Sequence, residues 1–168
     1  MIKSSSDQPD KRKIVIRKLV ESDLESCVKL FFETVHSVNG KDYTDEQLDA
    51  WAPDTVGATD PRVRTILSHI AYVAEIDKTF VGFGDMTEDG YLDRLFVHHD
   101  YQRMGIASAI VEKLEEQALK LGINEITTHS SITAKPFFQS FGYIVCKQQE
   151  VDVDGIKLIN FIMKKTLK

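Results

Sequence analysis

The sequence contains few of the residues that build disulfide frameworks and metal centres. Its two cysteines, Cys27 and Cys146, are far apart in the 168 residues and lie outside any Cys-x-x-Cys pair. This excludes a disulfide scaffold and a thiolate zinc site, so we expect both thiols to be small core residues. His98 and His99 are adjacent, a spacing that does not suit a metal clamp, and His129 stands alone on a predicted strand as a partly buried side chain. We therefore expect no metal.

Long hydrophobic runs and an excess of positive charge are also lacking. No apolar run approaches the ~18 residues of a membrane-spanning helix, and residues 1–13 have no apolar stretch of the kind found in signal peptides. Acidic residues outnumber basic ones, 26 to 21, which gives a formal net charge of −5. A negative net charge argues against a general surface for nucleic acid or for anionic membranes. We therefore expect a cytoplasmic protein without nucleic-acid or membrane partners.

What the chain does contain is the pattern of one α/β domain. It has no internal repeat and no long linker, so we expect a flexible polar tail over residues 1–11 and a single domain over residues 12–168. Periodicity and turn residues predict strands at residues 13–17, 71–76, 80–86, 91–97, 125–129, 143–153 and 156–164, and helices at residues 21–38, 44–51, 60–69, 105–121 and between Pro136 and Gly142. This order indicates a mixed α/β (α+β) domain, with parallel pairing expected wherever a helix crosses over.

The chemistry is concentrated in the polar loop between the predicted strand 91–97 and the helix 105–121. The first N–H groups of a helix lack partners and carry the positive end of the helix dipole, so such a loop can bind an anion. Gly105 has no Cβ and lets a phosphate approach the backbone, and Arg103 adds a positive charge. We therefore predict a phosphate or pyrophosphate ligand. The chain has no GxxxxGK(S/T) and no GxGxxG after a strand, which excludes a triphosphate P-loop and a dinucleotide fingerprint.

The same loop resembles the signature of the GNAT superfamily of N-acetyltransferases, (Q/R)-x-x-G-x-(G/A) after a strand of the type L-x-V. Residues 102–107 match it and follow Leu95-Phe96-Val97, and residues 134–143 resemble a second family motif, A-x-x-F-(Y/F)-x-x-x-G-(F/Y). The resemblance covers roughly residues 12–168, including the order of strands and helices. It implies the GNAT fold, with a mixed central sheet of about six to seven strands flanked by helices, acetyl-CoA as co-substrate, and a monomer or homodimer.

The resemblance also implies where acetyl-CoA binds. The pantetheine arm would lie beside Leu95, Phe96 and Val97, the Val97 amide would stabilise the oxyanion of the thioester carbonyl, and the pyrophosphate would bind the amides of residues 103–108. The further expected contacts are Gln102, Arg103, Met104, Gly105, Ile106, Ala107, Ser108, Ser131, Lys135 and Phe138. Ser131 stands where the family often has an Asn that contacts the arm, and capping of the next helix is an equal alternative.

Proton transfer is where this chain departs from the family. Asp93 has the strand parity of Leu95 and Val97 and is our candidate base; an ion pair is the structural alternative, and Asp85 and Glu88 compete for the role. Phe138 stands where family members often place a tyrosine as general acid, so that acid is missing at this position. Tyr143 is not expected to replace it, because it lies past the helix in the core.

The acceptor is expected to meet the family's variable segment. Tyr43, Trp51 and the loop to Pro61 fall there, and Asp85 is counted with them. Trp51 is either a core anchor or an aromatic wall for an apolar acceptor. We expect transfer of the acetyl group to an amine of a small molecule or peptide by direct attack in a ternary complex, since no nucleophilic cysteine stands out. The alternative is a non-catalytic acyl-CoA-binding sensor or interaction domain.

Overall fold

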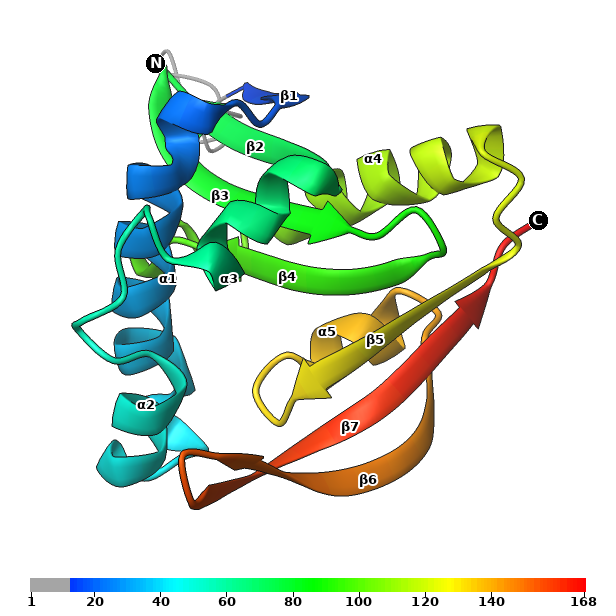
Figure 1. Ribbon diagram of the computed structural model, residues 1–168. Coiled ribbons are helices and arrows are strands. Elements are labelled where there is room, and N and C mark those ends of the chain that lie inside the picture. The colour runs from blue at the N-terminus through cyan, green and yellow to red at the C-terminus, as the bar shows by residue number, and fades with distance from the viewer. Residues whose placement is uncertain (1–12) are drawn as a thin grey trace, which may run out of the picture.

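The computed structural model describes residues 13–168, and the tail predicted over residues 1–11 lies outside them. The described residues form a mixed sheet of seven strands in the order β1-β2-β3-β4-β5-β7-β6 (Figure 1). The strands are β1 (Ile14–Lys18), β2 (Ile70–Ile76), β3 (Thr79–Met86), β4 (Tyr91–Val97), β5 (Glu125–Ser131), β6 (Ile144–Val153) and β7 (Ile156–Thr166). The predicted fold class and strand count are therefore confirmed.

Helices cover both faces of the sheet (Figure 1). They are α1 (Leu24–Val38), α2 (Asp45–Trp51), α3 (Pro61–Arg64), α4 (Ile106–Lys120) and α5 (Lys135–Ser140), with the 3-10 turns η1 (Glu21–Asp23), η2 (Asn39–Lys41), η3 (Thr65–Ser68) and η4 (His99–Tyr101). On one face, Ile110 and Leu114 of α4 join the main hydrophobic core with Phe138 of α5. On the other face, Leu30 of α1 packs in a separate cluster with Phe83 of β3.

Short-range signals in the sequence account for most element boundaries. Thr44 caps α2 and forms a capping box with Gln47, whose backbone N–H donates to Thr44 Oγ1 at 3.2 Å. The β2–β3 turn places Asp77 and Lys78 at φ values of 50° and 64°, the left-handed region that a tight hairpin turn requires. α4 ends before Gly122 at φ 76°. These boundaries agree with the predicted ranges.

Two expectations about the fold were wrong. The helical segment α1–α3 joins β1 to β2, yet these strands pair antiparallel, because α2 and α3 return along α1 and bring the chain back to the end of the sheet that it left (Figure 1). The crossover through α5 also gives no parallel pair, because β7 lies between β5 and β6. Cys146, expected in the core, is exposed on the edge strand β6, whereas Cys27 is buried in α1.

The sheet opens where the pairing of its one parallel pair of described strands ends. β4 and β5 pair only at Tyr91 with Thr127 and at Leu92 with Thr128, and then diverge (Figure 1). The register of β4 against β3 shifts at the same place, because Met86 lies opposite Leu92 while Asp85 lies opposite Arg94. Asp93 is therefore the extra residue of a β-bulge, and such a bulge bends a strand. The bend separates β4 from β5 beyond Leu92.

Candidate active site

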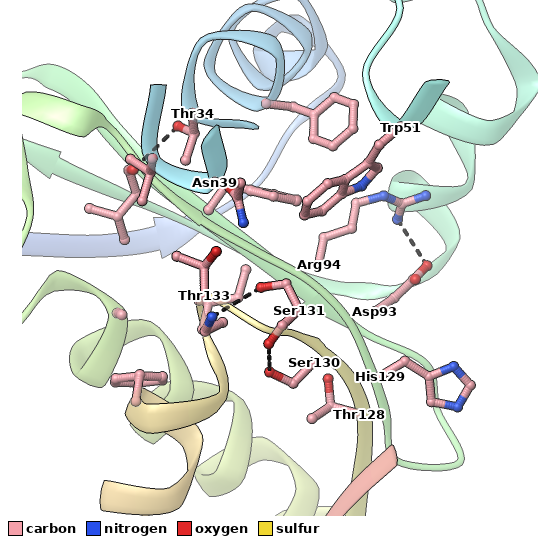
Figure 2. Close-up of a pocket in the computed structure, with 18 of the residues that line it drawn as sticks. Thr34, Asn39, Trp51, Asp93, Arg94, Thr128, His129, Ser130, Ser131 and Thr133 are labelled. Carbon is pink, nitrogen blue, oxygen red and sulfur yellow. Dashed lines mark hydrogen bonds and ion pairs between the residues drawn. The ribbon is translucent and has the colours of Figure 1, made fainter. Parts of the chain in front are cut away.

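A cleft of about 830 Å³ lies where β4 and β5 separate. Side chains of α1 and α2 line it from one face of the sheet, and the start of α4 and α5 line it from the other. In Figure 2, Thr34 and Trp51 lie on the side of β4 that α1 and α2 cover, while Ser130 and Ser131 of β5 lie across the gap. Because the gap runs between two strands, a ligand can reach it from each face.

The backbone of β4 turns unpaired groups into this gap. The His98 N–H donates to Val81 O at 2.8 Å, so His98 and Val81 form a hydrogen-bonded pair of the antiparallel ladder. Because backbone groups alternate along a strand, the N–H and C=O groups of Leu95 and Val97 point away from β3, into the gap that opens where β5 diverges from β4. The Val97 carbonyl already accepts from Gln102 Nε2 at 2.7 Å and from Thr34 Oγ1 at 3.3 Å. The Val97 N–H remains turned into the cleft.

The loop after β4 presents further backbone donors at the same end of the cleft. Gly105 is the N-cap of α4 at φ 84°, makes no side-chain cap, and has no described atom within 4 Å of where a Cβ would be. Arg103 also has a positive φ of 60°. Ile106 is buried at 1% exposure and anchors the helix start, which leaves the first amides of a 15-residue helix facing the open space. This cradle fits a pyrophosphate, and the β4 edge fits an amide-bearing arm such as pantetheine.

The cleft brings together most of the residues predicted for acetyl-CoA. The predicted residues that line it are Leu95, Phe96, Val97, Gln102, Arg103, Gly105, Ile106, Ala107, Ser108, Ser131 and Phe138. Met104 is 41% exposed and Lys135 lies with Nζ 4.3 Å from the centre of the Phe161 ring, and neither lines the cleft. Ser131 Oγ accepts from the Ala134 N–H at 3.0 Å within the turn between β5 and α5; this bond does not cap α5, whose N-cap is Ala134 without a side-chain cap.

Asp93 lines the cleft, but with a different orientation from the one its parity predicts. The bulge at Asp93 interrupts the alternation of β4, so its side chain does not follow Leu95 and Val97. One carboxylate oxygen lies 3.2 Å from Arg94 Nη1, and Figure 2 marks this ion pair with a dashed line. Partial burial raises the pKa of Asp93, and the Arg94 charge opposes that rise. Asp93 is thus a carboxylate more basic than usual, at the wall of the cleft.

Asp85 does not reach the cleft. Its side chain is fully buried, and Oδ2 accepts from His69 Nδ1 at 2.7 Å and from Arg94 Nη1 at 2.5 Å. The hydrogen bond from His69 to Asp85 raises the pKa of His69. Asp85 therefore holds the Arg94 guanidinium in place. The expectation that Asp85 contacts the acceptor is wrong, because its side chain is buried and does not line the cleft. Glu88, the other competitor for the base role, is exposed in the turn before β4 and does not line the cleft.

Arg94 is the residue on which this network depends, and its place in the sequence did not single it out. Besides both carboxylates, its guanidinium donates from Nη2 to Arg62 O at 2.8 Å and to Thr65 Oγ1 at 2.9 Å. It thereby ties β4 to β3 and to the α3–η3 segment. An arginine beside an aspartate on a predicted interior strand was the available signal, since a strand charge of that kind needs a partner.

Among residues 13–168, two groups of side chains have the composition of a cation site. They are His69 with Asp85 and Asp93, and Glu33 with His98 and His99. In the first group the Arg94 guanidinium already contacts both carboxylates. In the second, His98 Nδ1 accepts from the Asp100 N–H at 3.1 Å, so the neutral ring carries its proton on Nε2, which faces Glu33. Both groups are explained by contacts within the chain.

The predicted acceptor residues Tyr43 and Trp51 line the cleft in different roles. The Tyr43 hydroxyl donates to Ile159 O at 2.7 Å and accepts from the Ile132 N–H at 2.9 Å, so it ties the segment before α2 to β7 and to the end of β5. Trp51 is partly buried and meets Phe31 edge-on, with ring centres 6.5 Å apart. It therefore anchors α2, and its partly open ring lines the cleft.

Other cleft residues could not be recognised from their sequence positions. His129, expected to be partly buried, is exposed at the cleft and stands edge-on to Tyr91, with ring centres 5.1 Å apart. Asn160 of β7 also lines it, and its buried Oδ1 has no hydrogen-bond partner among residues 13–168. Phe138 lines the cleft, whereas Tyr143 is buried with its hydroxyl donating to Glu115 at 3.1 Å, as expected for a core residue.

The comparisons with known proteins agree with this geometry. Residues 39–167 match the family model described as acetyltransferase (GNAT) domain. The chain is 33% identical over 151 residues to the uncharacterized N-acetyltransferase YafP of Escherichia coli strain K12, covering 90% of this chain and 95% of that one. The chain belongs to the GNAT acetyltransferase family. A GCN5-related N-acetyltransferase from Rhodopseudomonas palustris has a similar structure, with 26% identity, a TM-score of 0.84 and coverage of 91% and 95% of the two chains.

A second solved structure shows the same fold. The PaiA N-acetyltransferase from Thermoplasma acidophilum, solved in complex with coenzyme A, is 22% identical with a TM-score of 0.72, covering 92% of this chain and 99% of that one. Family membership makes this chain an acetyl-CoA-dependent N-acetyltransferase with an amine acceptor, and supports transfer over the non-catalytic alternative. Within residues 13–168, no helix is long and apolar enough to cross a membrane.

Proposed function

We propose that the cleft aligns acetyl-CoA and a primary amine from opposite faces of the sheet, so that the acetyl group passes directly between them. The observation that supports this most is the Val97 N–H, which β3 leaves free and the separation of β5 exposes. The start of α4 opens on one face for the pyrophosphate, and α1 and α2 border the other face for the acceptor. Both substrates are bound at once.

The backbone does most of the work on acetyl-CoA. The first amides of α4 and the Arg103 charge bind the pyrophosphate, and the N–H and C=O groups of Leu95 hold the arm along the edge of β4 from which β5 has diverged. Gln102 and Thr34 satisfy the Val97 carbonyl and so fix the direction of that peptide. The Val97 N–H then points at the thioester carbonyl, where negative charge develops as the amine attacks.

Asp93 accepts a proton from the amine. A primary amine has a pKa of ~10.4, so the neutral nucleophile costs roughly 4–5 kcal/mol at pH 7. The raised pKa of Asp93 makes its carboxylate a better proton acceptor, directly or through one water. The amine nitrogen bonds to the acetyl carbon, the C–S bond breaks, and the thiolate of CoA leaves. Phe138 offers no proton to that thiolate, which is a tolerable leaving group without one.

A proline at position 97 tests the oxyanion role. Because the Val97 N–H makes no bond to β3, Val97→Pro removes the donor without removing a ladder hydrogen bond. We expect kcat to fall on the order of 10²- to 10³-fold, the loss seen when one oxyanion donor is removed. Val97→Ala retains the N–H and should lose far less. An unchanged kcat in a folded Val97→Pro protein would contradict the assignment.

Direct transfer is tested by an amine screen that follows release of the free CoA thiol. Initial rates should show that both substrates bind before either product leaves. Mass spectrometry of the protein after incubation with acetyl-CoA alone should find no acetylated side chain at the cleft. An acetyl group on a cleft residue that is then passed to the amine would replace the ternary complex with a covalent route.

A further inference from the structure

We infer that the acceptor is a small primary amine carried on an apolar, preferably aromatic, skeleton without a carboxylate beside the amine. The inference rests on the proposed function, because it concerns the acceptor face of the same cleft.

Aromatic rings from three elements form the wall of that face. Trp51 at the end of α2 lies with its ring centre 6.5 Å from Phe31 of α1 and 6.5 Å from Phe96 of β4, and Phe31 and Phe96 are 5.0 Å apart. All three side chains line the cleft and are only partly buried. Rings left partly open beside a reactive carboxylate offer an edge or a face to another ring.

The apolar surface continues beyond this wall. A second hollow of about 310 Å³ shares Val28, Phe31, Pro53 and Val56 with the main cleft, and Lys29, Glu33 and Asp54 stand along the rest of it. The acceptor side therefore has room for a hydrophobic group next to the rings. At the other end, Trp51 belongs to a hydrophobic cluster with Val153 and Leu158 of the β6–β7 hairpin. That contact closes the end of the wall and favours a small molecule over an extended peptide.

The charges beside the reacting amine exclude a neighbouring carboxylate. Asp93 is an anion, and Arg94, the cation next to it, already serves Asp85, Asp93, Arg62 O and Thr65. Arg62 is paired with Asp60 at 2.9 Å. An α-carboxylate held next to Asp93 would thus meet a like charge with no unpaired arginine beside it, and like charges at short range repel. The other cleft cations, Lys41 and Arg103, stand on η2 and on the loop before α4.

Matched pairs of amines test the inference on the full-length protein with acetyl-CoA. Phenethylamine should exceed ethylamine in kcat/KM on the order of 10- to 100-fold, because the ring buries apolar surface that ethylamine lacks. Phenylalanine, which adds only the carboxylate, should be a poorer acceptor than phenethylamine by at least about tenfold. Spermidine and trialanine represent polyamine and peptide acceptors, and each should fall below phenethylamine.

Substitutions at Trp51 and Val56 locate the effect. Trp51→Ala should raise KM for phenethylamine at least about tenfold more than KM for ethylamine, and Trp51→Phe should restore most of the difference. Val56→Asn makes the second hollow more polar without touching α2. It should therefore act in the same direction as Trp51→Ala, even where Trp51→Ala loosens the helix. Val145→Asn, the same change on the exposed β6, should leave the kinetics unchanged.

The outcomes separate this inference from the proposed function. If ethylamine, phenylalanine, spermidine or trialanine matches or exceeds phenethylamine, the acceptor class is wrong while amine acetylation stands. The same holds if Trp51→Ala and Val56→Asn affect ethylamine and phenethylamine equally. If no amine of the panel releases CoA from a protein that binds acetyl-CoA, the proposed function and the acceptor class both fail.

Discussion

The two faces of the cleft are built by different means. The face proposed for acetyl-CoA consists of backbone groups of residues 95–108, which are neighbours in the sequence. The face proposed for the acceptor consists of side chains from α1, α2, β4, β5 and the β6–β7 hairpin, which the fold brings together. Backbone recognition tolerates changes of most side chains, whereas a wall of side chains can change with each substitution. One face is therefore suited to a constant co-substrate and the other to a variable acceptor.

The largest effect is expected from Asp93→Asn, on the acceptor face. It should lower kcat by roughly 10²- to 10⁴-fold, the usual range for a general base, with little change in the affinity for acetyl-CoA. Burial raises the pKa of Asp93. The wild type should therefore lose activity on acidification with a midpoint above pH ~3.9, the pKa of a free aspartate. The pH–rate profile measures this loss on the acid side, and the acid limb should be absent from the profile of Asp93→Asn.

The matched control for Asp93→Asn is Glu112→Gln, the same change on the exposed surface of α4. An unaltered kcat and profile in Asp93→Asn would make Asp93 a structural partner of Arg94. Stability gives an independent readout with a defined sign. A carboxyl whose pKa is raised on folding destabilises the protein at neutral pH, because its charged form is less favourable in the folded state. Replacing this ionisable group in Asp93→Asn should therefore not lower the melting temperature at neutral pH.

Gly105→Val should act on the other face. At φ 84° a branched side chain is strained, and it would fill the space in front of the amides. We expect the affinity for acetyl-CoA to fall at least tenfold, about 1.4 kcal/mol, as isothermal titration can measure. Gly122→Val is the control, because Gly122 has φ 76° and equally open surroundings at the far end of α4. Equal losses of affinity in both variants would mean that strain alone is responsible.

The smallest effect concerns the charges beneath the acceptor face. The hydrogen bond to Asp85 raises the pKa of His69 above its usual 6.5. The pair therefore contributes stability that is fully present below pH 6.5 and is lost as pH rises through the higher pKa of the folded state. The melting temperature of the wild type should fall across that window, and His69→Gln should flatten the dependence. His99→Gln changes an exposed histidine and should keep it.

The sequence by itself determined the order of elements in the segment 91–122 and the family. Strand alternation, the polar loop, Gly105 and the glycine stop at Gly122 act over a few residues, so their structure follows from local backbone preferences. The loop could therefore be placed in detail, and its motif pointed to acetyl-CoA. The hairpin turns and the cap at Thr44 were predictable for the same reason.

Only the tertiary structure decided the orientation of Asp93, the burial of Asp85, the role of Arg94 and the exposure of His129. Asp93 deviates from its parity because β3 and β4 pair with a bulge, a property of two strands and not of one. Asp85 is closed off because His69 and Arg94 reach it from segments 16 and 9 residues away. The aromatic wall depends on α1 and α2 packing beside β4. Such contacts depend on register and strand separation, which local preferences along one chain do not encode.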